Sequence, residues 1–210
     1  MDYREESLVR YLDDAAAARP TPGGGSVAAV AAALASTMAS MAANFTAGKE
    51  KFEAVDAEVR AIADRLSLLC ASLLDLAHQD MAAYEGIMAA WRLPKETEEQ
   101  RFQRSRAVRL ATERSLACVG AVLTACKEIL EESRRLAEIA NPNLISDVGV
   151  ASELALGAVH ASWINLEVNL RGYDSPTERA AARTRGEDVV ARAERLAAET
   201  RRIVLEALRR

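Results

Sequence analysis

The scarcity and placement of helix-breaking residues constrain the fold of this chain most. Its 210 residues include only 10 glycines and 5 prolines, and most of these gather at a few junctions. Alanine, the best helix former, is frequent, whereas aromatic residues make up only 4% of the chain. No run of alternating apolar and polar residues indicates a strand. The sequence therefore predicts an all-α protein, an antiparallel bundle of about six helices, several of them long.

Start and stop signals place these helices within one domain, residues 1–210. Ser26 and Ser146 are predicted N-caps, Thr97 to Gln100 reads as a capping box, and Ser175 is an N-cap that a proline follows. Gly120 marks a candidate break in the fourth helix. The expected helices span approximately residues 3–18, 26–47, 52–91, 97–140, 147–170 and 176–210.

Charge and composition argue against several classes of protein. The formal net charge of −4 disfavours a nucleic-acid partner, which needs a basic surface. Cys70, Cys118 and Cys126 form no CxxC pair and the two histidines form no cluster, so we expect no disulfide framework and no metal. The charged first residues predict no signal peptide, and the apolar run 27–43 looks too short and too weakly apolar for a membrane span. We expect a cytoplasmic protein that does not bind a membrane.

The predicted third helix has one position at which its apolar pattern fails. Its stripe consists of Ile62, Leu66, Leu69, Leu73 and Leu76. The same spacing then reaches Asp80, where a bundle expects an apolar residue. Burial raises the pKa of a carboxyl group and suits it for acid–base chemistry near neutral pH. A structural carboxylate held by an arginine or by a neighbouring helix end is the alternative, and periodicity alone leaves both open.

The predicted fifth helix combines an apolar stripe with a polar face. The ordinary stripe consists of Val150, Leu154, Ala161, Ile164 and Val168. Beside it, Asn165 and Asn169 share a side of the helix because they are four residues apart. The two amides suit a flat, amide-bearing ligand, but they suit hydrogen bonds to each other and to loops equally well.

A glycine-rich loop, Gly23 to Ser26, leads into the predicted second helix. Free N–H groups at a helix N-terminus favour an anion or a carbonyl group. No Walker lysine follows and no strand precedes, so a nucleotide loop is not indicated, and a close-packed turn is the alternative. Lys49 and Lys95 lie just beyond predicted helix ends, where lysines are commonly solvated.

Six short segments in this order resemble one known family. They are residues 20–29 (PTPGGGSVAA), 43–49 (ANFTAGK), 80–84 (DMAAY), 93–97 (LPKET), 146–151 (SDVGVA) and 165–170 (NLEVNL). Together they resemble the formimidoyltetrahydrofolate cyclodeaminase family, which includes free-standing methenyltetrahydrofolate cyclohydrolases. The resemblance covers nearly the whole chain and implies an all-helical homodimer. Gly120 and Ala140 depart from the family pattern, which often has a proline and a glycine there.

The resemblance implies a role for each matching residue. Asp80 falls on the aspartate of the family's D-x-x-A-[FY] motif, its proposed proton donor. Asn165 and Asn169 are expected to hold the pterin or the amide, and Lys49 or Lys95 to attract the glutamate tail of a polyglutamylated substrate. The full set of expected substrate-binding residues is Gly23, Gly24, Gly25, Ser26, Lys49, Lys95, Asn143, Asp147, Asn165 and Asn169.

The implied activity is the conversion of 5-formimidoyltetrahydrofolate to 5,10-methenyltetrahydrofolate with release of ammonia. One alternative is a methenyltetrahydrofolate cyclohydrolase that gives 10-formyltetrahydrofolate. Another is a non-catalytic helical dimer that binds folate or a protein. No cofactor beyond the tetrahydrofolate substrate is expected.

Overall fold

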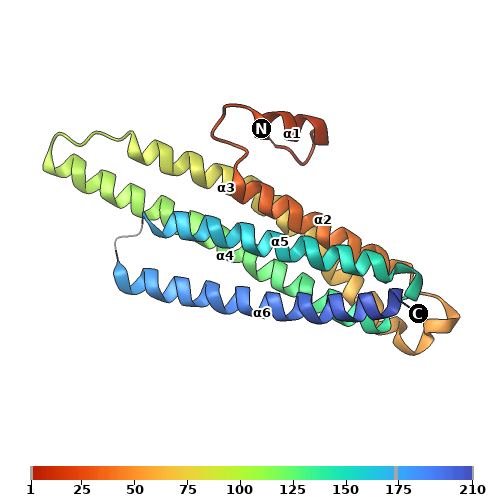
Figure 1. Ribbon diagram of the computed structural model, residues 1–210. Helices are drawn as coiled ribbons and strands as arrows, with labels where there is room; N and C mark the ends of the chain where they lie inside the picture. The colour runs from red at the N-terminus through yellow and green to blue at the C-terminus, as the bar shows by residue number, and fades with distance from the viewer. Residues whose placement is uncertain (1, 173–174, 210) are drawn as a thin grey trace.

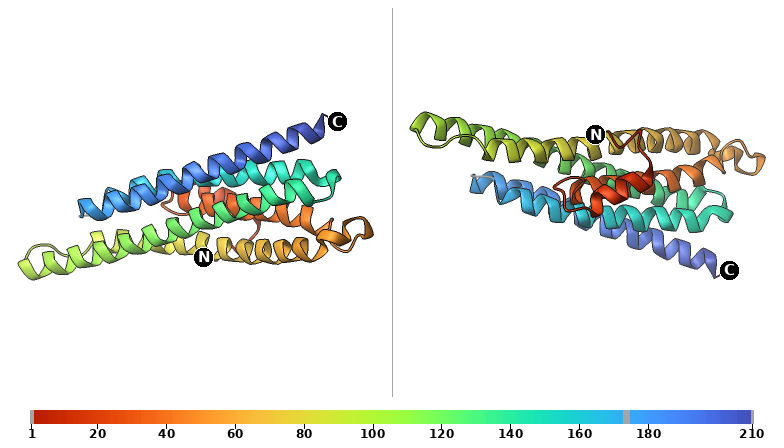
Figure 2. Two further views of the ribbon diagram at one scale, coloured as in Figure 1. Left: turned by 90° about the horizontal axis from the view of Figure 1, so that it is seen from below. Right: turned by 90° about the horizontal axis from the view of Figure 1, so that it is seen from above.

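The computed structural model describes residues 2–172 and 175–209, and its regular structure is entirely helical in this part of the chain. Five long helices lie alongside one another, and the short first helix lies outside them (Figures 1 and 2). The predicted all-α bundle is thus confirmed. The elements are α1 (Leu8–Ala16), α2 (Gly24–Asn44), η1 (Glu50–Val55), α3 (Asp56–Trp91), α4 (Glu98–Ile139), η2 (Pro142–Leu144), α5 (Ile145–Leu170) and α6 (Pro176–Leu208), where η denotes a 3₁₀ turn.

Two of the predicted helix starts are confirmed in detail. The Thr97 hydroxyl accepts a hydrogen bond from the Gln100 backbone N–H at 3.2 Å, and the Gln100 side chain accepts one from the Thr97 N–H at 3.1 Å. Ser175 accepts a bond from the Glu178 N–H at 3.3 Å, and proline follows it. Both signals are local in sequence, so they act in the same way in any fold.

Four predicted boundaries are wrong. Helix α1 begins at Leu8, with Ser7 as its N-cap. Helix α2 begins at Gly24 with Gly23 as N-cap, and Ser26 already lies inside the helix. Similarly, Ser146 lies inside α5, which follows the η2 turn. Helix α3 begins at Asp56 because residues 50–55 form a 3₁₀ turn, reached through the positive φ of Gly48.

The candidate break at Gly120 is absent, because α4 runs without interruption from Glu98 to Ile139. A single glycine in a helix interior costs about 1 kcal/mol. The neighbouring Val119, Val122 and Leu123 are buried in the core, and their packing offsets that cost.

Helix α2 is central to the bundle and contacts α3, α4 and α5. Its buried alanines allow these helices to approach closely, and their side chains are 0% exposed at Ala29, Ala32, Ala35, Ala39 and Ala42. By length and composition, Gly24–Asn44 and Pro142–Leu170 are each apolar enough to cross a bilayer. The expectation that the run 27–43 is too short and too weakly apolar for a membrane span was therefore wrong. The apolar character of α2 is explained by its packing within the bundle.

The apolar stripe expected on α5 lies on the surface instead of in the core. The exposed fractions of Val150, Ile164 and Val168 are 47%, 63% and 55%. The helix buries the opposite side, which consists of Val148, Ala151, Ala155, Ala158, Val159 and Leu166. Because α5 is apolar on most of its circumference, its periodicity does not indicate which side packs against the bundle.

Helices α2 and α5 pack side by side in opposite directions. Gly24, at the start of α2, lies against the Asn165 amide near the end of α5. At the other end, the Asn141 N–H donates to the Thr46 hydroxyl at 2.8 Å. Figure 1 looks onto both helices, with α3 and α4 behind them. We call the exposed apolar side chains of these two helices, together with Phe45 at the C-cap of α2, the α2–α5 apolar face; it consists of Val27, Leu34, Phe45, Val150, Leu154, Ile164 and Val168.

Candidate active site

The carboxyl group of Asp80, on α3, lies against the N-terminus of α2. A Cβ atom on Gly25 would come within 2.5 Å of Asp80 Cγ and 2.6 Å of Oδ2, so only glycine leaves room for this group. The backbone N–H of Ser26 lies near the carboxyl group and favours its charged form. The first amides of a helix have no partner within it and carry partial positive charge. The start of α2 therefore holds Asp80 in one position.

Burial raises the pKa of Asp80 above its ordinary value. Loss of hydration of the charged form is the larger effect, and the nearby Ser26 N–H acts in the opposite direction. Among ion pairs between described residues, none includes Asp80. Of the two partners named for a structural carboxylate, a helix end contacts Asp80, and no arginine pairs with it among the described ion pairs. A raised pKa increases the protonated fraction near neutral pH, as a proton donor requires.

Asn165 is the second predicted residue at this position. A Cβ on Gly24 would lie 3.2 Å from Asn165 Oδ1, so the amide covers the glycine backbone closely. The Nδ2 atom donates to the carbonyl of Ala161 at 2.9 Å. Oδ1 faces the same helix start as Asp80. The structure thus brings Gly24, Gly25, Ser26, Asp80 and Asn165 together, with Gly23 as the adjoining N-cap.

Tyr11, on α1, belongs to this cluster and was not predicted. Its hydroxyl lies 3.0 Å from Ser26 Oγ, and both side chains are buried. Burial raises the pKa of Tyr11, so its hydroxyl stays protonated near neutral pH. A hollow of about 200 Å³ beneath α1 is lined by Tyr11, Ser26 and Met81, and Asp80 is not among its lining residues. The sequence carries no signal for the contact between Tyr11 and Ser26, because these residues are 15 positions apart and a loop separates them.

Cys118, on α4, lies near the same carboxyl group. Its thiol donates to the carbonyl of Leu76 at 3.4 Å. Burial, and to a lesser extent the charge of Asp80, raises the pKa of Cys118 to about 12. The thiol is therefore protonated at neutral pH and does not act as a nucleophile. Of these two neighbouring groups, Asp80 is the candidate for acid–base chemistry.

Asn169 lies one turn beyond Asn165 and turns toward α4. Its Nδ2 atom donates to the hydroxyl of Ser115 at 2.7 Å. Lys95 is exposed in the loop after α3, beyond a helical segment from Asp80 to Trp91 that is about 16 Å long. Asn169 therefore lies beside the Asp80 cluster, whereas Lys95 lies outside it, at the far end of the α3–α4 hairpin.

Lys49, Asn143 and Asp147 lie at the opposite end of the bundle. Asp147 is in the first turn of α5, about 27 Å along the helix from Asn165. Lys49 follows the end of α2, and Asn143 is exposed in η2. Within one copy of the chain, these three residues do not share a site with Asp80, although the resemblance assigned them to one.

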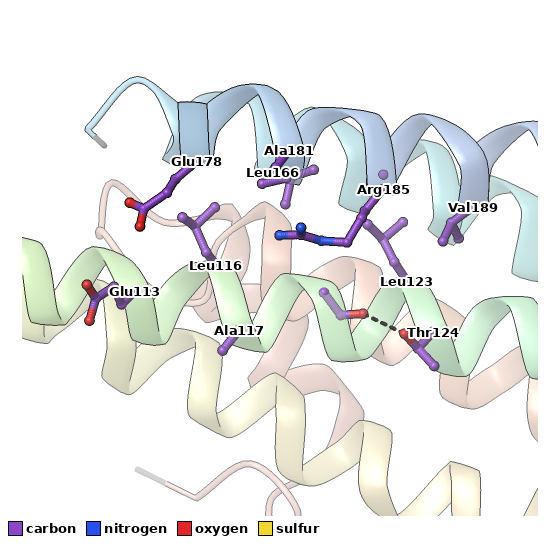
Figure 3. A pocket seen from close by; sticks show the side chains of 13 residues that line it. Glu113, Leu116, Ala117, Leu123, Thr124, Leu166, Glu178, Ala181, Arg185 and Val189 are labelled. Atoms are coloured by element: carbon purple, nitrogen blue, oxygen red, sulfur yellow. Dashed lines mark hydrogen bonds between the residues drawn. The ribbon is translucent and has the colours of Figure 1, made fainter. Parts of the chain in front are cut away.

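A larger hollow, of about 670 Å³, lies between α4 and α6 (Figure 3). Leucine, valine and alanine side chains make up most of its wall, with Glu113, Glu178 and Arg185 beside them. None of the predicted site residues lines it. Because Asp80, Asn165 and the glycine loop converge elsewhere, we place the candidate active site at the start of α2.

Comparisons with known proteins find relatives of this chain over most of its length. The family described as formiminotransferase-cyclodeaminase matches residues 7–188. A methenyltetrahydrofolate cyclohydrolase from Methylorubrum extorquens is 34% identical over 173 residues, covering 80% of this chain and 81% of that protein. The formimidoyltransferase-cyclodeaminase of Rattus norvegicus is 29% identical over 80% of this chain, which spans 31% of that longer protein.

The fold of a solved structure supports the same family assignment. The crystal structure of formiminotetrahydrofolate cyclodeaminase from Thermotoga maritima matches with a TM-score of 0.88 and 28% identity, covering 98% of each chain. The resemblance stated from the short segments is thereby confirmed over nearly all of the sequence. By sequence and by fold, this chain belongs to the formiminotransferase-cyclodeaminase family.

Proposed function

We propose that this protein acts on the one-carbon bridge between N5 and N10 of tetrahydrofolate, converting the 5-formimidoyl compound to 5,10-methenyltetrahydrofolate and ammonia. The observation that carries the proposal is the half-buried carboxyl group of Asp80, which has a raised pKa and lies at the start of α2. The names of the Thermotoga maritima and rat proteins support this reaction.

Asp80 acts as the general acid in this scheme. N10 attacks the formimidoyl carbon and its proton passes to the imino nitrogen, which gives a tetrahedral carbon bearing an amino group. The C–N bond to that amino group then breaks, and the protonated carboxyl of Asp80 supplies the proton with which ammonia leaves. The carboxylate that remains is stabilised by the Ser26 N–H and by the positive end of α2.

A second candidate reaction is the hydrolysis of the methenyl compound to 10-formyltetrahydrofolate. It is favoured by the Methylorubrum extorquens relative, which is matched over four-fifths of its own length. Here the carboxylate of Asp80 removes a proton from the attacking water and returns it to N5 as the ring opens. The hydroxyl group left on the carbon releases its proton to solvent as the formyl C=O bond forms. Both reactions pass through a tetrahedral carbon, so one site serves either. Neither scheme uses a cofactor or a metal.

A second copy of the chain completes the site in our proposal. The α2–α5 apolar face is exposed along both helices, and an apolar face of this extent indicates a protein partner. Gly24 and Asn165 lie near one end of it. Suppose that α5 of one copy packs antiparallel against α5 of the second copy. The end of the first copy that carries Lys49, Asn143 and Asp147 then lies beside the Asp80 end of the second copy. In such a homodimer, the predicted site residues that lie far apart within one copy would meet in one site between the two copies.

The near-ultraviolet absorbance of methenyltetrahydrofolate tests the function. Purified protein is given 5-formimidoyltetrahydrofolate in one experiment and the methenyl compound in another. Formation of the methenyl absorbance above the rate without protein identifies a cyclodeaminase, and accelerated loss identifies a cyclohydrolase. If neither rate changes, the non-catalytic alternative stands and the proposal fails.

A further inference from the structure

The side-chain amide of Asn165 is held in one orientation at the start of α2. Its Nδ2 atom donates to the carbonyl of Ala161 at 2.9 Å, and a carbonyl group can only accept such a bond. This bond identifies which end of the amide is the nitrogen. The oxygen, Oδ1, lies 3.2 Å from the position of a Cβ atom on Gly24, and Nδ2 is almost as near, at 3.3 Å, but is directed to Ala161. Asn165 therefore presents an acceptor to the start of α2.

This acceptor is unused within the described part of the chain. Among the hydrogen bonds of residues 2–172 and 175–209, the Asn165 side chain takes part in the bond to Ala161, and no residue donates to Oδ1. The buried side-chain atoms without a partner belong to His78, Ser133, Ser152 and Ser162. Since Oδ1 is not one of them, it is open to solvent and can accept an N–H bond from a ligand.

Asp80 and Asn165 approach the first turn of α2 from two different helices. The carboxyl group of Asp80, from α3, lies against Gly25, and the amide of Asn165, from α5, lies against Gly24. The Cα atoms of these two glycines are about 3.8 Å apart, because they are consecutive in the chain. One small group bound at this turn is therefore within reach of both a proton donor and a hydrogen-bond acceptor.

The nitrogen that leaves in the proposed deamination has use for both. It carries an N–H group as the imine of the substrate, becomes an amine when N10 attacks, and leaves as ammonia once Asp80 has protonated it. Positive charge develops on the nitrogen in that last step, which strengthens the hydrogen bond that it donates to an amide oxygen. The oxygen of a formyl group has lone pairs instead and would face Oδ1 with no proton between them. An acceptor at this position thus distinguishes an imino nitrogen from a formyl oxygen.

We propose that Asn165 determines substrate specificity, selecting the 5-formimidoyl over the 5-formyl compound because Oδ1 accepts a hydrogen bond from the imino nitrogen. The proposal rests on the proposed function, since it takes the one-carbon group of a folate to lie at Asp80. It goes beyond the resemblance, which left Asn165 to hold either the pterin or an amide. Asn165 binds the leaving nitrogen, and Asp80 remains the group that transfers the proton.

Binding to a slow variant separates selection from turnover. All measurements use the Asp80→Asn protein, in which turnover is expected to be at least about 100-fold slower. Calorimetry gives the dissociation constants of 5-formimidoyltetrahydrofolate and 5-formyltetrahydrofolate. In this background, Asn165→Leu removes the acceptor and approximately keeps the shape of the side chain, whereas Asn165→Asp keeps an acceptor in either orientation. The control is Gln103→Leu, which removes an exposed side-chain amide of α4 that donates to Glu99.

We expect the Asp80→Asn protein to bind the 5-formimidoyl compound more tightly than the 5-formyl compound. The positive charge of a protonated formimidoyl group contributes to this preference, so the comparison between variants isolates the effect of Asn165. Asn165→Leu should reduce the preference at least about tenfold, which is the effect of one charge-assisted hydrogen bond. Asn165→Asp should keep the preference, because a carboxylate accepts from the imino nitrogen at least as strongly. Gln103→Leu should leave it unchanged.

The possible results separate this proposal from the proposed function. An unchanged preference in Asn165→Leu overturns the role of Asn165 even if the absorbance assay shows formation of the methenyl compound. An equal loss in Asn165→Leu and Asn165→Asp also overturns it, since the effect then depends on shape and not on the acceptor. A preference that Asn165→Leu loses and Asn165→Asp keeps supports the proposal even where the absorbance assay detects no turnover. If neither compound binds, the proposed function and this proposal both fail.

Discussion

Asp80 on α3 fills the space that a side chain on Gly25 would occupy. The carboxyl group lies so close to the first turn of α2 that a Cβ atom on Gly25 would overlap its Cγ and both oxygen atoms. Two segments far apart in the sequence, the glycine loop and the D-x-x-A-[FY] motif, therefore depend on each other. The glycine makes room, and the helix start supplies the N–H group that favours the charged form of the carboxyl.

Replacing Gly25 with alanine tests this dependence. In Gly25→Ala the added methyl group must displace Asp80, and we expect turnover to fall about 100-fold, as misplacement of a reacting group by about 1 Å can cause. Overpacking should also cost about 1 to 3 kcal/mol of stability. Steady-state kinetics and denaturant unfolding measure the two effects.

Gly86 provides the matched control for this substitution. It lies inside α3, where an added Cβ meets no atom within 4 Å. Gly86→Ala should keep wild-type turnover and stabilise the protein by about 0.5 to 1 kcal/mol. Normal activity in Gly25→Ala would mean that the contact with Asp80 is dispensable.

Tyr11 joins α1 to the active-site helix through its bond to Ser26. Tyr11→Phe removes the hydroxyl and leaves the buried Ser26 Oγ without that partner, which should cost about 1 to 3 kcal/mol. We expect a severalfold loss of kcat, because the start of α2 becomes less fixed. The exposed Tyr84 is the control, and equal effects of Tyr11→Phe and Tyr84→Phe would remove α1 from the account.

Asp80 should make the folded protein less stable as the pH rises. Its pKa is raised on folding, so the protonated group favours the folded state below the unfolded pKa of about 4. That contribution is lost as the pH rises through the folded pKa. The Asp80→Asn variant lacks this loss, so its unfolding midpoint should exceed that of the wild type at pH 8 and converge with it near pH 3. A constant difference across this range would contradict a buried, titrating carboxyl group.

The α2–α5 apolar face should hold two copies together. Ile164→Glu combined with Leu34→Glu places charges in the proposed interface, and light scattering should then give the monomer mass of 22.7 kDa in place of twice that value. Turnover should fall in parallel, because the second copy completes the site. Leu68, which is 71% exposed on α3, is the control, and Leu68→Glu should remain dimeric. A wild-type chain that is monomeric at the assay concentration contradicts this part of the proposal.

Local signals in the sequence were sufficient for much of the fold. The capping box at Thr97 and the N-cap at Ser175 depend on neighbours within four residues, and both form as predicted. Asp80 was detectable because one charged residue interrupted an otherwise regular stripe. Its contact with Gly25 was not predictable, since it depends on how closely α3 crosses the start of α2.

Other features depend on tertiary packing, which periodicity does not report. Helix α5 is apolar on several sides, so its pattern did not show that Ile164 and Val168 lie outside the bundle. Ser26 looked like an N-cap, yet the permissive glycines before it let the helix start earlier and bury its side chain.

The most direct measurement of the central claim is the turnover of Asp80→Asn. The substitution keeps the size of the side chain and an oxygen that can accept from Ser26, but it removes the acid. We predict that kcat falls at least about 100-fold, the contribution expected of a general acid, while the circular dichroism spectrum and the oligomer mass stay those of the wild type. The wild-type rate should fall as the pH rises through the raised pKa of Asp80. A folded Asp80→Asn variant that turns over the substrate at the wild-type rate would contradict the account.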